Sequence, residues 1–190
     1  MTDKKALRTE LRARRAAQEA EIPAAMRSLL FHRPPAPLLS LVPDGAVVSL
    51  YYPIPGEASP LAYARWFAER GHPIALPWFA ERGAPMQFKA WDNPFDDALL
   101  EADPYGTLQP RGDAADAAPA VAIVPLLGFD ARGQRLGQGG GHYDRFLAAN
   151  PATVAIGIGW DCQFVDELPH EPHDIPLRAV ITPTRFYGPF

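Results

Sequence analysis

The spacing of apolar residues predicts a chain in which short strands alternate with helices, separated by prolines and glycines. Near the N-terminus, Leu7 and Leu11 are one helical turn apart, and Asp3 precedes them as the expected N-cap residue. Helical spacing predicts helices at 3–20, 23–31, 60–70 and 144–149. Runs rich in β-branched and aromatic residues predict strands at 46–52, 72–79, 86–91, 120–124, 153–160 and 178–182. The acidic, proline-bearing segment 92–119 shows little periodicity, and we expect a loop with one helical turn.

This alternation is typical of a single α/β domain over residues 1–190, with a mostly parallel sheet covered by helices on both faces in an open, Rossmann-like three-layer sandwich. In such sheets ligands bind at the carboxyl ends of the strands. Glu57, a glycine-rich stretch at 137–141 and Asp174 would meet there only if the strand order brings them together.

The amino-acid composition favours a globular protein and argues against several classes of binding protein. A chain of 190 residues that is 47% hydrophobic can bury a substantial core. A net charge of −4 argues against a general nucleic-acid or membrane-surface binder. The single cysteine, Cys162, excludes an internal disulfide, and no run of roughly 20 apolar residues occurs, so we expect a cytoplasmic protein.

The basic residues concentrate in the first fifteen positions, and composition alone favours ordinary surface charge on a solvated amphipathic helix. The six residues are Lys4, Lys5, Arg8, Arg12, Arg14 and Arg15.

The glycine-rich stretch is the strongest sign of a ligand site. Gly137 and 139–141 stand between Arg135 and Arg145, and the following residues have helical character. Glycines let backbone N–H groups converge on a ligand, and a helix N-terminus attracts anions, so we expect a phosphate site to which the two arginines add charge. The stretch is neither a P-loop, since the chain has no Gly-Lys pair, nor a dinucleotide fingerprint, since His142 takes the third glycine position. The alternative is a flexible surface loop.

The segment VPLLGFDARGQRLGQGGGHYDR at 124–145 resembles the signature of the 5-formyltetrahydrofolate cyclo-ligase family. Shorter matches follow the family order over nearly the whole chain. They are KKALR at 4–8, YPIPGEAS at 52–59, LP at 76–77, MQF at 86–88, and PHD at 172–174 followed by a strand and Thr182.

The resemblance implies ATP-dependent closure of 5-formyltetrahydrofolate to 5,10-methenyltetrahydrofolate, with release of ADP and phosphate. It also implies Mg²⁺ as cofactor, ATP as co-substrate, and a monomer that binds small molecules and neither nucleic acid nor membrane. Catalytic roles would fall to Arg135, Tyr143 and Arg145, and magnesium ligation to Asp144 and Asp174. The implied ATP contacts are Lys4, Lys5, Arg8, Arg135, Leu136, Gly137, Gln138, Gly139, Gly140, Gly141, His142 and Tyr143. The implied substrate contacts are Tyr52, Glu57, Tyr105, Gly139, Gly140, Gly141 and His142.

Two positions depart from the family pattern. His142 stands where an aromatic residue is common, and Gln109 stands where many bacterial members have Glu, so we assign Gln109 no charge-dependent role. Under the resemblance, Arg12, Arg14 and Arg15 keep the interpretation of surface charge. Among the candidate stacking residues Trp78, Phe88, Trp91 and Tyr105, we expect only Tyr105 near the site.

Two other functions stay open. A metal-dependent hydrolase or sugar-phosphate isomerase could use His170, Glu171, His173 and Asp174 as metal ligands, although their spacing matches no zinc motif and an ordinary polar loop is favoured. An ATP-binding sensor without turnover is the non-enzymatic alternative, against which the joint presence of Glu57, Asp144 and Asp174 argues.

Overall fold

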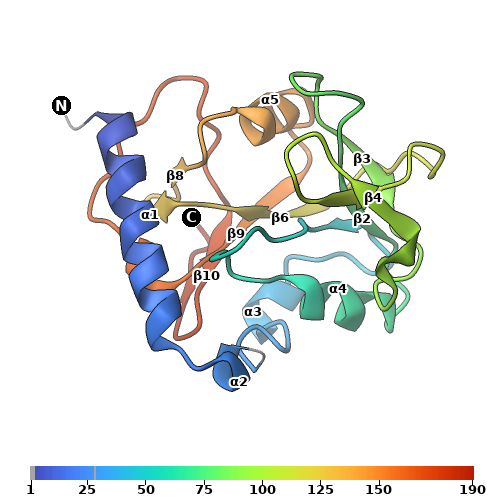
Figure 1. Cartoon of the computed structure of the whole chain (residues 1–190), viewed down its shortest axis with the longest axis horizontal. Coiled ribbons are helices and arrows are strands. Elements are labelled where there is room, and N and C mark those ends of the chain that lie inside the picture. The colour runs from blue at the N-terminus through green and yellow to red at the C-terminus, as the bar shows by residue number, and fades with distance from the viewer. Residues whose placement is uncertain (1–2, 28) are drawn as a thin grey trace.

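A seven-stranded sheet organises the protein, as a computed structural model describes it over residues 3–27 and 29–190 (Figure 1). The strand order is β11-β10-β9-β6-β1-β2-β3. The strands are β1 (Val48–Ser49), β2 (Ile74–Trp78), β3 (Gln87–Ala90), β6 (Val121–Pro125), β9 (Val154–Ile158), β10 (Ala179–Ile181) and β11 (Phe186–Tyr187).

The five central strands are parallel, and the two edge strands β3 and β11 pair antiparallel to their neighbours. From β1 the chain passes through α4 (Leu61–Ala68) to β2 on one side of β1. From β6, on the other side of β1, it passes through α5 (His142–Ala149) to β9. The direction of winding therefore reverses between β1 and β6, and such a reversal opens a crevice at the carboxyl ends of the strands.

The side chains of β6 point alternately to the two faces of the sheet and pack in two different clusters. Val121 and Ile123 pack in the cluster that contains the α4 residues Tyr63 and Phe67. Ala122 and Val124, which alternate with them, pack with residues of α5 in a second cluster. Figure 1 shows α5 on one side of the sheet, and α4 with α3 (Ala36–Leu39) on the other. The predicted mostly parallel α/β sandwich is confirmed.

Helix α1 (Lys4–Glu21) begins as predicted at Asp3, whose carboxylate accepts a hydrogen bond from the Lys5 N–H. Leu7 and Leu11 are buried in a cluster with three further leucines, Leu127, Leu136 and Leu168. Arg15, two turns beyond Leu7, is also buried. The interpretation of Arg15 as surface charge is therefore wrong, because residues 7, 11 and 15 share the face that packs on the protein.

Several predicted boundaries differ from the structure. The helix expected at 23–31 is described only as α2 (Ala24–Arg27). After Ser28, which lies outside the described residues, the chain forms a turn at 29–30 and reaches a left-handed backbone at Phe31. Helix α5 begins two residues before the predicted start. The strand predicted at 46–52 is only two residues long, because the chain leaves the sheet before the prolines at 53 and 55.

Two hairpins escaped prediction because their strands are only two or three residues long, too short for any periodicity to show. In the segment 92–119, a turn of 3-10 helix, η1 (Asp97–Leu99), leads into β4 (Leu100–Ala102), which pairs with β5 (Leu108–Pro110). Ahead of the glycines, β7 (Gly128–Phe129) pairs with β8 (Arg135–Leu136). Asp130 closes the β7–β8 turn by accepting hydrogen bonds from the N–H groups of Arg132 and Gln134. A second short 3-10 helix, η2 (Asp161–Gln163), follows β9. Within 3–27 and 29–190, no helix has both the length and the apolar character to cross a membrane.

Candidate active site

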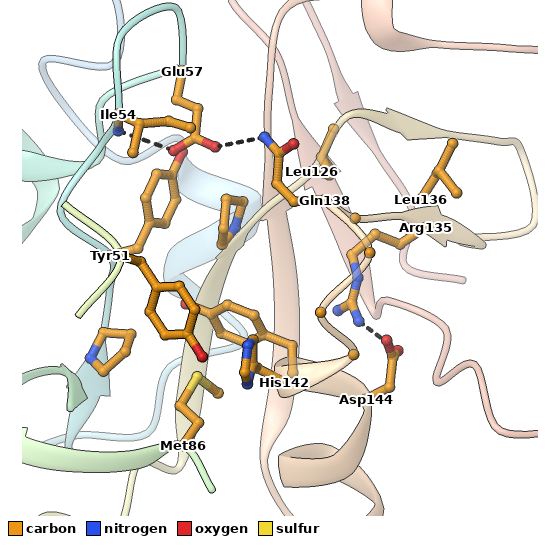
Figure 2. Close-up of a pocket in the computed structure, with 18 of the residues that line it drawn as sticks. Tyr51, Ile54, Glu57, Met86, Leu126, Arg135, Leu136, Gln138, His142 and Asp144 are labelled. Carbon is orange, nitrogen blue, oxygen red and sulfur yellow. Dashed lines mark hydrogen bonds and ion pairs between the residues drawn. The ribbon is translucent and has the colours of Figure 1, made fainter. Parts of the chain in front are cut away.

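A cavity of about 620 Å³ opens at the crevice between β1 and β6. Its walls come from the carboxyl ends of the parallel strands β1, β2 and β6, from the glycine stretch and from the first turns of α1. Figure 2 shows side chains that line this space, among them Tyr51 and Glu57 from the segment after β1, Gln138 from the glycine stretch and His142 from the segment that follows it. Glu57, the glycines and Asp174 all line it, so the strand order does bring the three predicted features together.

The glycine loop forms one end of the cavity. Gly139 and Gly141 have positive φ angles of 110° and 63°, and Gly141 is the N-cap residue of α5. The Arg8 guanidinium donates from Nε to the Gly137 carbonyl at 3.0 Å. A Cβ placed on Gly140 would come within 2.6 Å of His142 Cδ2. Loop, helix N-terminus and arginine together form the basic end of the cavity, and anion binding there stays a prediction.

Arg135 is the buried cation of this end. Its side chain is 3% exposed, and its Nη2 donates to Asp144 Oδ1 at 2.5 Å. Burial lowers the pKa of Arg135, which the Asp144 charge opposes. Nη1 has no hydrogen-bond partner among the described residues, and neither has the buried hydroxyl of Tyr143, whose ring lies 5.9 Å from the guanidinium carbon. Burial raises the pKa of Tyr143 far above its usual value, so the phenol stays protonated and can donate. Both groups are available to an anionic ligand.

A second basic group approaches from α1. Lys4 Nζ donates to Asp174 Oδ2 and Glu171 Oε2, both at 2.7 Å. Burial by itself would raise the pKa of Asp174, but the hydrogen bonds from Lys4 and the Glu171 N–H outweigh it and lower that pKa. For Lys4, likewise, burial opposes but the two carboxylates prevail and raise its pKa. Both groups are charged at neutral pH.

Glu57 lies at the other end of the cavity from Arg135 and Asp144, and Gln138 of the glycine loop lies between them (Figure 2). Its side chain is 7% exposed, and Oε2 accepts a hydrogen bond from the Ile54 N–H at 3.2 Å. Oε1 faces Gln138 Nε2 and Arg15 Nη1, each at 3.5 Å. Burial raises the pKa of Glu57, while the Ile54 N–H and the charge of Arg15 oppose that rise. A carboxylate with one oxygen only loosely engaged can accept N–H groups of a ligand.

Aromatic rings line the wall between the two ends. The His142 ring lies edge-on to Phe79 and Tyr105, with centroids 4.9 and 5.4 Å apart. Burial, and then the charge of Arg145, lower the pKa of His142, so its ring is neutral at pH 7. Gln109 supports this wall from behind: its buried amide accepts from the Phe79 N–H at 2.9 Å and donates to the Phe79 carbonyl at 3.2 Å. The arrangement suits a flat, partly aromatic ligand.

Most residues singled out from the sequence lie in the cavity lining. Lys5 and Arg145 do not, and Arg145 Nη2 instead lies 3.1 Å from His142 Nδ1. Tyr105 is in the lining as expected, whereas Phe88 and Trp91 are core residues and Trp78 lies under Lys89. Tyr52 also lines it, and its hydroxyl donates to Asp97 at 2.7 Å.

The alternative metal-ligand set is only partly assembled. Ligand atoms of Glu171, His173 and Asp174 lie within 4.8 Å of one another, without His170, in the part of the chain that the structure describes. The Lys4 ammonium already pairs with both carboxylates of that group.

Sequence reasoning missed Arg15, Tyr51 and Phe79 as residues of the site or its immediate support, and it considered Glu171 only as a metal ligand of the alternative function. The signal for Arg15 was available, since it continues the i, i+4 series of Leu7 and Leu11 on a face known to be buried. Tyr51 and Tyr52 both line the cavity, and the Tyr51 hydroxyl donates to the carbonyl of Ala58, the residue after Glu57.

Fold and cavity together define a doubly wound α/β protein with a candidate small-molecule site at the topological switch point, between the basic end and Glu57. The sequence profile of the 5-formyltetrahydrofolate cyclo-ligase family matches residues 1–183. The chain belongs to this family.

Individual relatives agree. The 5-formyltetrahydrofolate cyclo-ligase of Mycolicibacterium smegmatis is 31% identical over 147 residues, which is 75% of this chain and 76% of the relative. The Escherichia coli K12 protein of the same name is 46% identical over 85 residues, which is 42% of this chain and about half (47%) of that relative. The NMR structure of Aquifex aeolicus 5,10-methenyltetrahydrofolate synthetase superposes with a TM-score of 0.71 at 25% identity, covering 96% of this chain and 93% of that one. The synthetase from Mycoplasma pneumoniae shares the fold, with a TM-score of 0.67 at 22% identity over 95% of this chain and 98% of that one.

Proposed function

We propose that this protein uses ATP to convert 5-formyltetrahydrofolate into 5,10-methenyltetrahydrofolate, with release of ADP and phosphate. The observation that carries the proposal is the polarity of one cavity. The basic end, with its glycines and cations, and the buried Glu57 carboxylate line the same cavity, and aromatic rings form the wall beside them. A nucleotide triphosphate and a pterin need these two ends.

The chemistry begins with a poor leaving group. The oxygen of a formamide does not depart unaided, so the γ-phosphoryl group of ATP is transferred to it, and N10 then attacks the activated formyl carbon. Phosphate leaves as the new C–N bond closes the ring. Phosphoryl transfer depends mainly on positioning and on neutralising charge over the phosphate oxygens.

The basic end is equipped for that task. Arg135 Nη1 and the Tyr143 hydroxyl are buried donors with no partner in the described chain, so a phosphoryl oxygen would satisfy both. Arg8 is held against the loop by the Gly137 carbonyl, and its charge lies beside the loop N–H groups. These donors are fixed before the reaction, so little reorganisation is required as charge develops.

At the other end, Glu57 binds the pterin ring through hydrogen bonds. An ionised carboxylate accepts two adjacent N–H donors, the pattern that an aminopyrimidinone ring presents. The loose 3.5 Å approach of Gln138 to Oε1 leaves that oxygen free to exchange partners. His142, Phe79 and Tyr105 would flank the ring system between the two ends.

The donor set of the basic end fits Mg²⁺. Asp144 and Asp174 line the cavity, both act on the charge of Arg135, and hard carboxylate oxygens suit this ion, which usually keeps several waters beside one or two such ligands. When bound, the ion would neutralise phosphate oxygens. To hold the ion, Asp174 would share or exchange its pairing with Lys4.

The test is direct. Purified protein is mixed with 5-formyltetrahydrofolate, ATP and Mg²⁺, and the absorbance of methenyltetrahydrofolate is followed with ADP and phosphate measured in parallel. We expect product, ADP and phosphate in equal amounts, and no product when ATP is omitted. Glu57→Gln is the matched variant, because it should raise KM for the folate and leave ATP binding unchanged. Binding of ATP without product in the wild type would reject the proposal in favour of a nucleotide sensor.

A further inference from the structure

Arg15 is a buried charge that the proposed reaction leaves without a role. Its side chain is 8% exposed and lies on the face of α1 that also carries Leu7 and Leu11. Nη1 has no hydrogen-bond partner among the residues described, and its nearest acidic group is Glu57 Oε1 at 3.5 Å. An arginine is always protonated, and a buried, incompletely paired guanidinium is costly.

The Arg15 side chain also lies next to the turn that carries Glu57. This turn has Gly56 at φ +86°, and a Cβ there would lie 3.5 Å from Arg15 Nε and 3.2 Å from Glu19 Oε2. The Gly56 carbonyl accepts a hydrogen bond from Trp160 Nε1 at 2.9 Å. Backbone contacts therefore fix the turn, while the side chains of α1 face it.

Resting on the proposed function, we propose that Arg15 is a positioning residue for the folate: it keeps the Glu57 carboxylate ionised and aimed into the cavity. The argument is electrostatic. Glu57 is buried, and in the absence of a nearby cation a buried carboxyl group takes up a proton. A protonated Glu57 would carry a donor where the pterin needs a second acceptor.

The other groups around Glu57 cannot replace this cation. Tyr51 and Tyr143 lie close enough to feel the charge of Glu57, but burial raises the pKa of both phenols, so they are neutral at pH 7. Gln138 is uncharged, and Glu19, beside Gly56, is paired with Arg27 at 2.6 Å. Arg15 is thus the cation that faces Glu57 in the described chain.

The role also connects the two ends of the site. Lys4 and Arg8 of the same helix serve the phosphate end, and Arg12 donates to Gln138 Oε1 at 2.9 Å. The first four turns of α1 therefore place one cation at Asp174, one at the glycine loop and one at Glu57.

The test compares Arg15→Met, which keeps the apolar stem and removes the charge, with Arg14→Met. Arg14 is exposed, pairs with Glu10 and loses the same charge from the same helix, so it is the matched control. In the ligand-free protein, the titration of Glu57 is followed by ¹³C NMR of labelled glutamate carboxyls, with Glu57→Gln to assign the signal. Binding of 5-formyltetrahydrofolate and of ATP is measured separately by calorimetry from pH 5 to 8.

We expect Arg15→Met to move the Glu57 titration to higher pH and to weaken folate binding roughly tenfold at pH 7, with ATP binding unchanged. Folate binding should be lost as pH falls, and at a higher pH in the variant than in the wild type. Arg15→Lys should restore the midpoint in part, because it restores the charge. Arg14→Met should match the wild type. Where Arg15→Met does not fold, Arg15→Gln serves, since it keeps N–H donors without the charge.

The outcomes distinguish failure of the role proposed for Arg15 from failure of the proposed function. An unchanged Glu57 titration in folded Arg15→Met or Arg15→Gln overturns the role of Arg15, whatever ligand the protein binds. Equal weakening of folate and ATP with a fixed titration identifies a merely structural residue and overturns it too. If the Glu57 titration moves in the Arg15 variants but the wild-type protein binds no 5-formyltetrahydrofolate, the proposed function is rejected and the role of Arg15 is kept.

Discussion

The Asp144→Ala substitution tests whether Arg135 is a buried cation that depends on one carboxylate. The two side chains are 2.5 Å apart, and Arg135 is 3% exposed. Removing one partner of a buried pair costs about 3–5 kcal/mol, because the other charge stays buried and unpaired. Asp144 is 22% exposed, so water can replace part of the lost contact, and we expect the low end, about 3 kcal/mol.

The free energy of unfolding is measured by urea titration, with the slope on urea required to stay unchanged. Asp116→Ala is the control, because Asp116 also pairs with a cation, Lys89 at 2.8 Å, but is 85% exposed. We expect that control to lose less than about 1 kcal/mol. The double variant Arg135→Met/Asp144→Ala removes both charges and should recover most of the stability lost in Asp144→Ala.

The reasoning is refuted if Asp144→Ala loses no more stability than Asp116→Ala. It is also refuted if the double variant is less stable than Asp144→Ala, since the cost would then not come from the unpaired guanidinium. Catalytic activity should be absent from both Asp144 variants, so activity does not distinguish them and stability must be the readout.

Three shorter predictions concern the loop, the charge pair and the aromatic wall. Gly139→Ala places a Cβ at φ +110° beside Arg8 and should weaken ATP binding by roughly tenfold, as measured by calorimetry. Gly45→Ala is the control, because Gly45 has φ +68° and nothing near its Cβ, and it should leave ATP affinity unchanged. Equal effects of the two substitutions would contradict this prediction. The stability difference between wild type and Lys4→Met should be constant over about pH 5–9. It should shrink in acid, where Asp174 with its lowered pKa is protonated, and in strong base, where Lys4 with its raised pKa is deprotonated, as urea titrations at several pH values would reveal. His142→Phe should keep KM for the folate within about threefold and independent of pH near 6.5, since the neutral ring acts by packing; a large rise in KM would show that a ring nitrogen binds the substrate.

Much of the fold is local in origin and could be predicted. Strands such as Val121–Pro125 and Val154–Ile158 are buried on both faces, so their apolar runs are continuous, and the N-cap Asp3 marks the start of the first helix. The short strands of the two hairpins could not be found this way. Their formation depends on pairing with a partner strand and on the Asp130 turn, and two or three residues carry no period.

The site was predictable where the backbone demanded an unusual residue, as in the glycine loop. The site could not be predicted where an ordinary residue has a role only because the tertiary fold places it beside the cavity. Arg14 and Arg15 are indistinguishable in composition, yet a rotation of about 100° along the helix leaves one in solvent and buries the other beside Glu57. Gln109 likewise acts through its neutral amide, which fixes the backbone of Phe79, a contact that depends on the pairing of distant segments.

The way helix α1 is anchored has a consequence for how the protein folds. Its polar contacts reach 170 residues along the chain from Lys4 to Asp174, 129 from Arg8 to Gly137 and 144 from Gln18 to Cys162. Closing loops of this length gains little until the sheet that carries the distant partners exists. Helix α1 therefore docks late, and until it does the sheet lacks the cations of this helix. The native fold and a competent site are completed in the same step, so a chain that has not finished folding has no assembled pocket for its ligands.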